Sequence, residues 1–123
     1  MATPSAVMTE LPSSGSGDPV WKVTWTGLAN GEFGEAVRLP EHADRSFQVT
    51  GTFGAGGSVA VEGSNDGGTN YAALRDPSST TIAITAAGIK AVLEFTQLIR
   101  PRVTAGDGTT ALTVTAVFRR TRR

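Results

Sequence analysis

The sequence predicts an all-β fold, a single β-sandwich of about seven or eight strands with a flexible N-terminal arm. At 123 residues the chain has the length of one domain. Short runs in which apolar and polar residues alternate recur at intervals of roughly ten residues, and clusters of Gly, Pro, Asn and Asp separate them. Both a jelly-roll and an immunoglobulin-like sandwich satisfy this pattern.

Composition divides the chain into three regions. Residues 1–19 are expected to form an extended arm, because they are rich in Ser, Gly, Thr and Pro and cannot bury enough apolar surface to become ordered alone. The sandwich is expected over residues 20–118, and a basic tail over residues 119–123. The sizeable apolar residues of the arm are Val7, Met8 and Leu11.

The first strand is predicted over residues 20–26, where Trp21 and Trp25 lie on one face. Two Trp on one face favour a position in the core, because each buries a large area. A stacking platform for sugars or bases is the alternative. A short strand is expected next, over residues 35–39, and Pro40 ends it.

A hairpin is predicted at the centre of the chain, after a strand over residues 46–53. Residues 58–74 alternate on both sides of a break at Asn-Asp-Gly-Gly, residues 65–68. These residue types tolerate the positive φ that a tight turn needs. Tyr71 and Leu74 resume the alternation, so both arms of the hairpin are expected to be half-buried strands.

Four further strands are predicted after the hairpin. Residues 81–86 carry Ile82 and Ile84 on one face, and residues 89–95 alternate in the same way. The shared face of this second run consists of Ile89, Ala91, Leu93 and Phe95.

The last two strands are predicted over residues 97–104 and 111–118, with an Asp-Gly turn between them. Pro101 indicates that the first of these is an edge strand, or that Pro101 lies at a position where its missing N–H does no harm. The second closes the fold. Its inward residues are Leu112, Val114, Ala116 and Phe118.

Catalytic, cofactor-binding and metal-binding residues are not predicted in this chain. The absence of Cys removes disulfides, thiolate nucleophiles and Cys-based metal sites. The single His, His42, lies between acidic residues and is expected to be a solvated loop residue. Carboxylates between residues 32 and 44 could be paired, but their spacing does not favour a glycosidase over a solvated surface. The chain is therefore predicted not to be an enzyme.

The formal net charge is zero, but the charge is unevenly distributed. Residues 1–66 hold eight acidic and three basic residues, a net charge of −5, and residues 67–123 hold the reverse. Four of the last five residues are Arg. Such a tail binds polyanions and acidic protein surfaces alike. Nucleic acid is the less favoured partner, because no known reading module accompanies the tail.

No membrane contact is expected. The N-terminal residues Met-Ala-Thr-Pro-Ser lack the basic region and the apolar core of a signal peptide. No apolar run approaches the length of a membrane span. The protein is therefore expected to be made in a cytoplasm and to stay in solution.

Three stretches carry a resemblance to a known group of proteins. Residues 61–71 contain Glu-Gly-Ser-Asn-Asp-Gly, residues 85–90 read Thr-Ala-Ala-Gly-Ile-Lys, and residues 100–109 begin with Arg-Pro-Arg-Val. Together they resemble small β-sandwich virion proteins of tailed bacteriophages. The resemblance implies a capsid decoration (cement) protein, which binds the outside of the capsid lattice and stabilises it. It also implies the major capsid protein as partner, a homo-oligomer (dimer or trimer), and a place in the virion after synthesis in the host cytoplasm.

Two other functions fit the residues. A phage tail or head–tail connector component would share the fold but assemble alone into rings or tubes. A carbohydrate-binding module would need Trp21, Trp25 or Tyr71 exposed in a shallow groove. For a decoration protein, the predicted contact residues lie in the arm and the tail: Val7, Met8, Leu11, Arg119, Arg120, Arg122 and Arg123.

Overall fold

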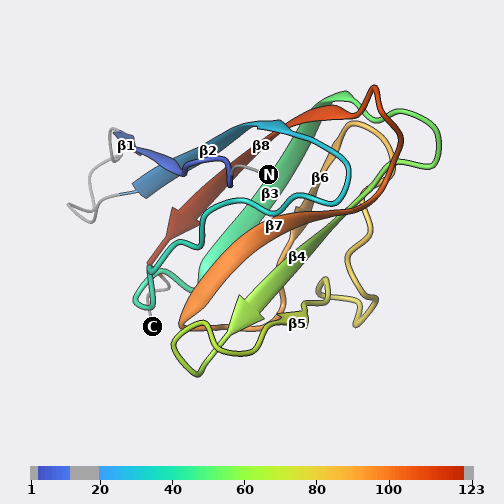
Figure 1. Ribbon diagram of the computed structural model, residues 1–123. Helices are drawn as coiled ribbons and strands as arrows, with labels where there is room; N and C mark the ends of the chain where they lie inside the picture. Colours follow the sequence, from blue (N-terminus) through green and yellow to red (C-terminus); the bar gives the residue numbers. More distant parts are fainter. Residues whose placement is uncertain (1–2, 12–19, 121–123) are drawn as a thin grey trace.

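The computed structural model describes residues 3–11 and 20–120, and the regular secondary structure of these residues is all β (Figure 1). Within these residues, eight strands form two antiparallel sheets, one of five strands and one of three. The sheets enclose one hydrophobic core, so the predicted single β-sandwich is confirmed. Within the described residues, no helix is long and apolar enough to cross a membrane.

The strands of each sheet are mostly not neighbours in sequence. The larger sheet has the order β1 (Val7–Leu11), β2 (Val20–Leu28), β8 (Ala111–Arg119), β3 (Asp44–Thr52), β6 (Gly88–Ala91). The smaller sheet has the order β5 (Ala72–Ala73), β4 (Ser58–Ser64), β7 (Leu98–Ala105). β1 and β6 are therefore the edges of the larger sheet, and β7 is an edge strand, as Pro101 predicted.

An irregular segment, residues 32–37, extends the smaller sheet beyond β7. The N–H of Gly34 donates to the carbonyl oxygen of Pro101 at 2.9 Å, and Val37 exchanges backbone hydrogen bonds with Ile99. The N and O atoms of a strand residue point the same way, so the nitrogen of Pro101 faces this segment and its missing N–H removes no bond to β4. The short strand predicted in this part of the chain is wrong, because only isolated bridges form.

The strand order distinguishes the two kinds of sandwich. With residues 32–37 counted as an irregular strand, the chain changes sheets after every element from β2 onward, except at the β4–β5 hairpin. An immunoglobulin-like sandwich keeps its last two strands in one sheet. Here β7 and β8 lie in different sheets. The protein is therefore a jelly roll.

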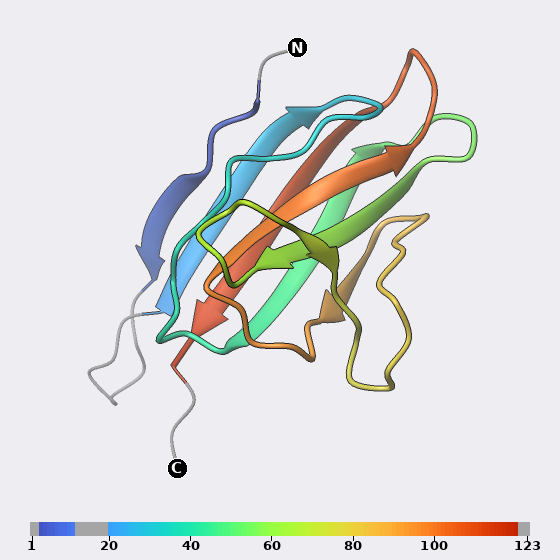
Figure 2. The ribbon, with the colours of Figure 1, turned by 60° about the horizontal axis from the view of Figure 1, so that its bottom comes forward.

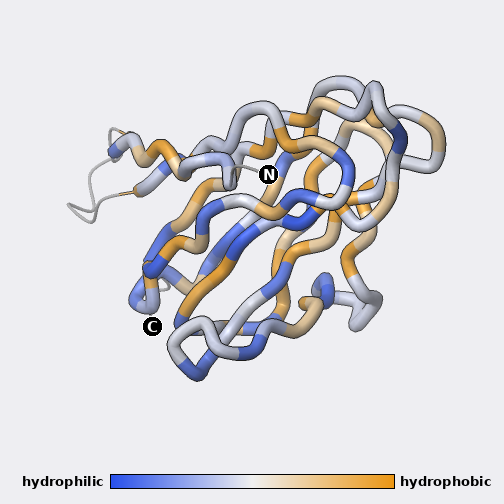
Figure 3. Tube along the Cα trace, in the orientation of Figure 1, coloured by the Kyte–Doolittle hydropathy of each residue, from blue (hydrophilic) through white to orange (hydrophobic). Residues whose placement is uncertain are grey.

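The core contains the predicted inward faces of β2, β3 and β8. The ring of Trp25 stacks on Phe47 with the centroids 5.9 Å apart, and Phe118 meets Phe47 edge-on. The indole N–H of Trp25 donates to the carbonyl oxygen of Glu35 at 2.8 Å, so its polar atom is satisfied. Figure 3 shows hydrophobic stretches on the strands of both sheets. The buried residues of these three strands include Val23, Trp25, Phe47, Val49, Leu112, Val114, Ala116 and Phe118.

β4 and β5 form the predicted central hairpin. Glu62 pairs with Ala73 and Gly63 with Ala72. The two arms differ from the prediction of half-buried strands: β4 is buried along most of its length, and β5 has two exposed residues. The cause is position, because β4 lies between β5 and β7 while β5 is an edge.

The run over residues 81–86 does not form the predicted strand. It makes isolated bridges to other segments, at Thr81 and at Ile84. Both Ile82 and Ile84 are nevertheless buried, as their shared face predicted.

The predicted apolar face over residues 89–95 is not buried. β6 ends at Ala91, and Val92, which belongs to the opposite face of the run, is the buried residue at 7% exposure. The register explains the difference. Ile89 lies opposite Gln48, and cross-strand partners share a face, so Ile89 points outward with the exposed polar side of β3. The exposed residues of the predicted face are Ile89, Ala91, Leu93 and Phe95.

His42 is buried, at 6% exposure, rather than solvated as predicted. The turn that carries it folds against the end of β3: the N–H of His42 donates to the carbonyl oxygen of Leu39, and Nε of Arg45 donates to the carbonyl oxygen of His42 at 2.7 Å. Neither ring nitrogen of His42 has a hydrogen-bond partner among the described residues. The backbone contacts of the turn therefore place the ring, not its own polar atoms.

Part of the predicted flexible arm belongs to the sheet. Residues 7–11 form β1, which pairs antiparallel with β2, from Val7 opposite Thr24 to Leu11 opposite Val20. The sheet supplies hydrogen-bond partners that the segment lacks by itself, which is why composition alone predicted an arm. The rest of the region over residues 12–19 lies outside the described residues.

Candidate functional site

Large exposed apolar side chains gather at the two edges of the five-stranded sheet. On β1, Val7 is 61% exposed and Met8 is 42% exposed. On the opposite side, Leu93 is 46% exposed and Phe95 is 54% exposed, shortly after β6, which itself carries the exposed Ile89. Figure 2 shows β1 and β6 on opposite sides of the molecule. These edges are candidate contact surfaces, because groups of exposed apolar side chains often mark interaction sites.

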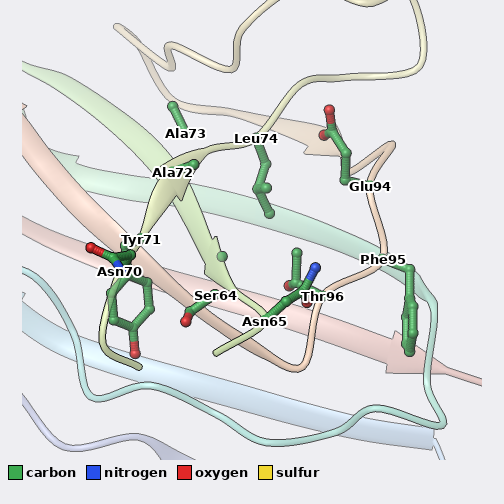
Figure 4. A pocket seen from close by; sticks show the side chains of 11 residues that line it. Ser64, Asn65, Asn70, Tyr71, Ala72, Ala73, Leu74, Glu94, Phe95 and Thr96 are labelled. Atoms are coloured by element: carbon green, nitrogen blue, oxygen red, sulfur yellow. The ribbon is translucent and has the colours of Figure 1, made fainter. Parts of the chain in front are cut away.

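A pocket of about 370 Å³ opens on the β5–β6 side, next to Phe95. Figure 4 shows Tyr71 and Phe95 at its two ends, with Leu74 between them. The pocket combines apolar walls with amide, hydroxyl and carboxylate groups, which suits it to receive an amphipathic group. Its lining residues are Gly63, Ser64, Asn65, Asn70, Tyr71, Ala72, Ala73, Leu74, Glu94, Phe95 and Thr96.

Asp66 organises the hairpin loop on one side of the pocket. Its carboxylate accepts hydrogen bonds from the backbone N–H and the side-chain amide of Asn70, both at 2.9 Å, and from the hydroxyl of Ser64 at 2.8 Å. The backbone bond from Asn70, followed by the two side-chain bonds, lowers the pKa of Asp66 to about 2. The loop is therefore held by an anionic carboxylate at neutral pH.

Glu94 forms part of the opposite wall and is tied to Arg75. The backbone N–H of Arg75 donates to Oε1 of Glu94 at 2.7 Å, and Nε of Arg75 donates to Oε2 at 2.6 Å. The backbone bond from Arg75 is the main cause that lowers the pKa of Glu94. Both oxygens are thus occupied and the group stays ionised, so its arrangement suits a fixed wall rather than a proton donor.

Behind the pocket, Arg45 is buried in the sandwich and anchors the wall that carries Phe95. Its Nη2 donates to the carbonyl oxygens of Leu39 and Thr96, each at 3.1 Å. Its guanidinium carbon lies 5.5 Å from the ring centroids of both Phe95 and Phe118. Burial lowers the pKa of Arg45 to about 10, so the group remains a cation at neutral pH. The sequence predicted this strand only from residue 46, whereas β3 begins at Asp44, so the burial of Arg45 was not predicted.

A second Arg lies on the outer face of the smaller sheet. The guanidinium carbon of Arg100 lies 3.9 Å from the ring centroid of Phe33 and 3.6 Å from that of Tyr71, between the two rings. Its Nε donates to Glu62 at 3.1 Å. This stack orients Tyr71 at one end of the pocket.

The structure separates the predicted contact residues. Val7 and Met8 are exposed on β1, and Leu11 is half-buried at its end. Arg119 forms an ion pair with Asp44, and Arg120 forms one with Glu41 at 2.9 Å. These pairs offset the positive charge of the tail within the chain. The two remaining predicted residues, Arg122 and Arg123, lie outside the described residues.

The two Trp of β2 do not form a platform. Trp25 is fully buried, and Trp21 packs partly buried against the core. Of the three aromatic residues considered for sugar stacking, only Tyr71 lines the pocket. Within the described part of the chain, no group of three or more His, Cys, Asp or Glu side chains is placed to hold a metal ion.

Sequence reasoning missed the surface formed by Leu93 and Phe95. Their alternation with Val92 and Glu94 was assigned to a strand face that packs inward, but β6 is short and the smaller sheet does not cover this side. No local signal in the sequence indicated this surface, because the charged Lys90 and Glu94 lie on the alternate face of the run and favour burial of the apolar face.

Comparison with known proteins does not show a family. No family model matches the chain, and no curated protein matches it. Among solved structures, the chain is similar to the Schizosaccharomyces pombe Cnp3 cupin domain, with 13% sequence identity and a TM-score of 0.43. The match covers 93% of this chain and 60% of that chain. The chain thus spans less than two thirds of the length of that structure.

Proposed function

We propose that this protein is a non-enzymatic structural component of a phage virion, which binds the outside of the capsid lattice and stabilises it as a decoration protein. One observation carries the proposal. Exposed apolar side chains lie at both edges of one sheet, Val7 and Met8 on β1 and Leu93 and Phe95 beside β6. A protein that bridges neighbours on a lattice needs two such surfaces, and repeated weak contacts then give avidity.

The surface proposed to contact the major capsid protein is the one formed by Leu93, Phe95 and the adjacent pocket. Exposed aromatic side chains beside a recess are typical anchors of protein interfaces. Phe95 is held from behind by Arg45, so its ring loses little freedom on binding. The pocket offers space for one side chain of the partner.

The other two functions predict different behaviour. A tail or head–tail connector component would assemble alone into closed rings or tubes. A carbohydrate-binding module would use Tyr71 with the amides of Asn65 and Asn70 in the same pocket. One face of Tyr71 is already taken by Arg100, which favours the protein-binding function over sugar stacking.

The test is co-sedimentation of the purified protein with empty capsids of its phage. We expect saturable binding for the wild type and at least a tenfold loss for Phe95→Asp, because a buried carboxylate would replace the aromatic anchor. Thr52→Asp is the matched control: Thr52 is exposed at the C-terminal end of β3, whereas Arg45 lies near the N-terminal end, and its substitution should leave binding unchanged. Equal binding of both variants would show that the surface with Phe95 does not contact the capsid. Lack of capsid binding, together with rings or with retention on a glycan column, would instead support the connector or the carbohydrate-binding module.

A further inference from the structure

The edges of the two sheets differ in how they are protected against pairing with another chain. β6 has four residues and carries Lys90, and β5 has two residues. The outer edge of β7 is covered by residues 32–37. Shortness, an edge Lys and a covering segment are the usual devices against edge-to-edge association. Among the described strands, β1 is the least protected edge: it has five residues and one charge, Glu10, and no described segment pairs with its outer side.

β1 is suited to pairing by its length and side chains. It has five residues, Val-Met-Thr-Glu-Leu, with one charge. Its register with β2 places Val7, Thr9 and Leu11 on the outer face of the sheet, opposite Thr24, Lys22 and Val20. Met8 and Glu10 lie on the other face. Half of its peptide groups point away from β2, as in any edge strand.

We propose that β1 binds β1 of a second copy of this chain, antiparallel, about a two-fold axis at Thr9. Every pairing among the described strands is antiparallel, and antiparallel ladders are somewhat more stable for each residue than parallel ones. A two-fold axis is the usual symmetry of a homodimer, and it brings identical strands together in antiparallel orientation. The two larger sheets then become one continuous sheet.

The axis at Thr9 follows from the side chains. A two-fold axis perpendicular to the joined sheet keeps the outer faces of the two copies on the same side. Such an axis must place one residue of β1 directly opposite the same residue of the partner strand. At Thr9 all five residues are paired: Val7 meets the partner's Leu11 and Met8 meets the partner's Glu10, each twice. At Glu10 the two carboxylates would lie directly opposite each other, which is unfavourable. With the axis at Met8, Leu11 would have no partner residue in the β1 strand of the other copy.

This dimer uses a different edge from the surface proposed to contact the capsid. The side with Leu93 and Phe95 stays open in both copies, so one dimer could engage two lattice positions. The dimer is measured in the absence of capsids. Failure of one proposal is therefore distinguishable from failure of the other.

The first test uses the absence of Cys from the chain. Directly opposed residues of an antiparallel pair have Cβ atoms about 4.5–5.5 Å apart, close enough for a disulfide after a small adjustment. With an added mild oxidant, Thr9→Cys should form a disulfide-linked dimer of about twice the 12.7 kDa chain mass. Thr52→Cys, exposed at a strand end on the same sheet, should remain monomeric. Equal cross-linking of the two variants would overturn the proposal.

The second test reads the register without a covalent bond. Met8→Asp places a carboxylate opposite the partner's Glu10 at two positions, and Met8→Lys places an ammonium group there. Because both symmetry-related charge pairs are repulsive in Met8→Asp and attractive in Met8→Lys, the dissociation constants of the two variants should differ by at least about tenfold, with Met8→Asp the weaker dimer. Analytical ultracentrifugation from about 1 to 300 µM covers the weak association expected of a small interface. A wild type that stays monomeric over this range, or equal constants for the two variants, would overturn the proposal.

Discussion

Nη2 of Arg45 donates to the carbonyl oxygen of Thr96 at 3.1 Å, and this bond joins the start of β3 to the wall of the pocket that carries Phe95. The two residues lie 51 positions apart in the sequence. A buried cation therefore holds the shape of a surface that we propose as a contact with the capsid.

Replacement of this cation should destabilise the protein. In Arg45→Met, the carbonyl oxygens of Leu39, His42 and Thr96 lose a charged donor in the interior, so we expect the free energy of unfolding to fall by about 2–4 kcal/mol. Chemical denaturation measures the difference. Arg38→Met, at an exposed position next to Leu39 in the sequence, should change stability by less than about 0.5 kcal/mol. Similar stability of the two variants would contradict this role of Arg45.

The glycine at position 34 is required by the packing of Trp25. A Cβ atom at Gly34 would lie 2.7 Å from Nε1 of Trp25, whose ring is rigid and fully buried. Gly34→Ala should therefore displace the ring and lower the free energy of unfolding by about 1–3 kcal/mol. Gly108→Ala is the control, since a Cβ there meets no atom within 4 Å. Trp fluorescence and denaturation together test this, and an unchanged emission spectrum in Gly34→Ala would count against the clash.

Two Arg residues of β7 share one carboxylate but differ in their other contacts. Arg100 lies between two aromatic rings as well as beside Glu62, whereas Arg102 reaches Glu62 at 3.6 Å without an aromatic contact. Arg100→Lys loses the planar stacking, so we expect a loss of about 1–2 kcal/mol, and Arg102→Lys should cost less than about 0.5 kcal/mol. Thermal unfolding of both variants gives the comparison. Equal losses would mean that the ion pair, not the stack, is the stabilising contact.

Acid should destabilise the fold through the turn carboxylates. Hydrogen bonds from the Thr109 hydroxyl and then from the backbone of Ala55 lower the pKa of Asp107 to about 2. An ordinary Asp has a pKa of about 3.9, so the unfolded chain binds more protons in this interval and stability rises with pH. The contribution is present above about pH 4 and is lost as the pH falls toward 2. Urea unfolding at several pH values measures this slope.

The same measurement on two variants isolates Asp107. In Asp107→Asn the slope of stability between about pH 4 and 2 should become shallower, because one carboxylate no longer titrates. In Thr109→Val the loss of the hydroxyl donor should raise the pKa of Asp107 in the folded protein. The pH range over which this carboxylate contributes to the slope should therefore become narrower. An unchanged slope in Asp107→Asn would assign the acid sensitivity to other groups.

The strands with long alternating patterns could be predicted from the sequence. β2, β3, β7 and β8 and the central hairpin follow from local alternation and turn residues. Pro101 also predicted an edge strand, because the chemistry of a missing N–H is a property of the residue itself. These features depend on neighbours in the chain, so one sequence is sufficient to find them.

The tertiary structure decided where an alternating apolar face is left uncovered. Alternation over residues 89–95 is the same in a covered and an uncovered strand, and only the pairing of β6 with β3 shows that the face with Ile89 points outward. The burial of Arg45 and His42 and the pairing of β1 likewise depend on segments far away in the sequence. The jelly-roll strand order also depends on contacts between distant segments, because it is set by which strands pair within each sheet. Burial and partner choice are relations between distant segments, and a local pattern does not contain them.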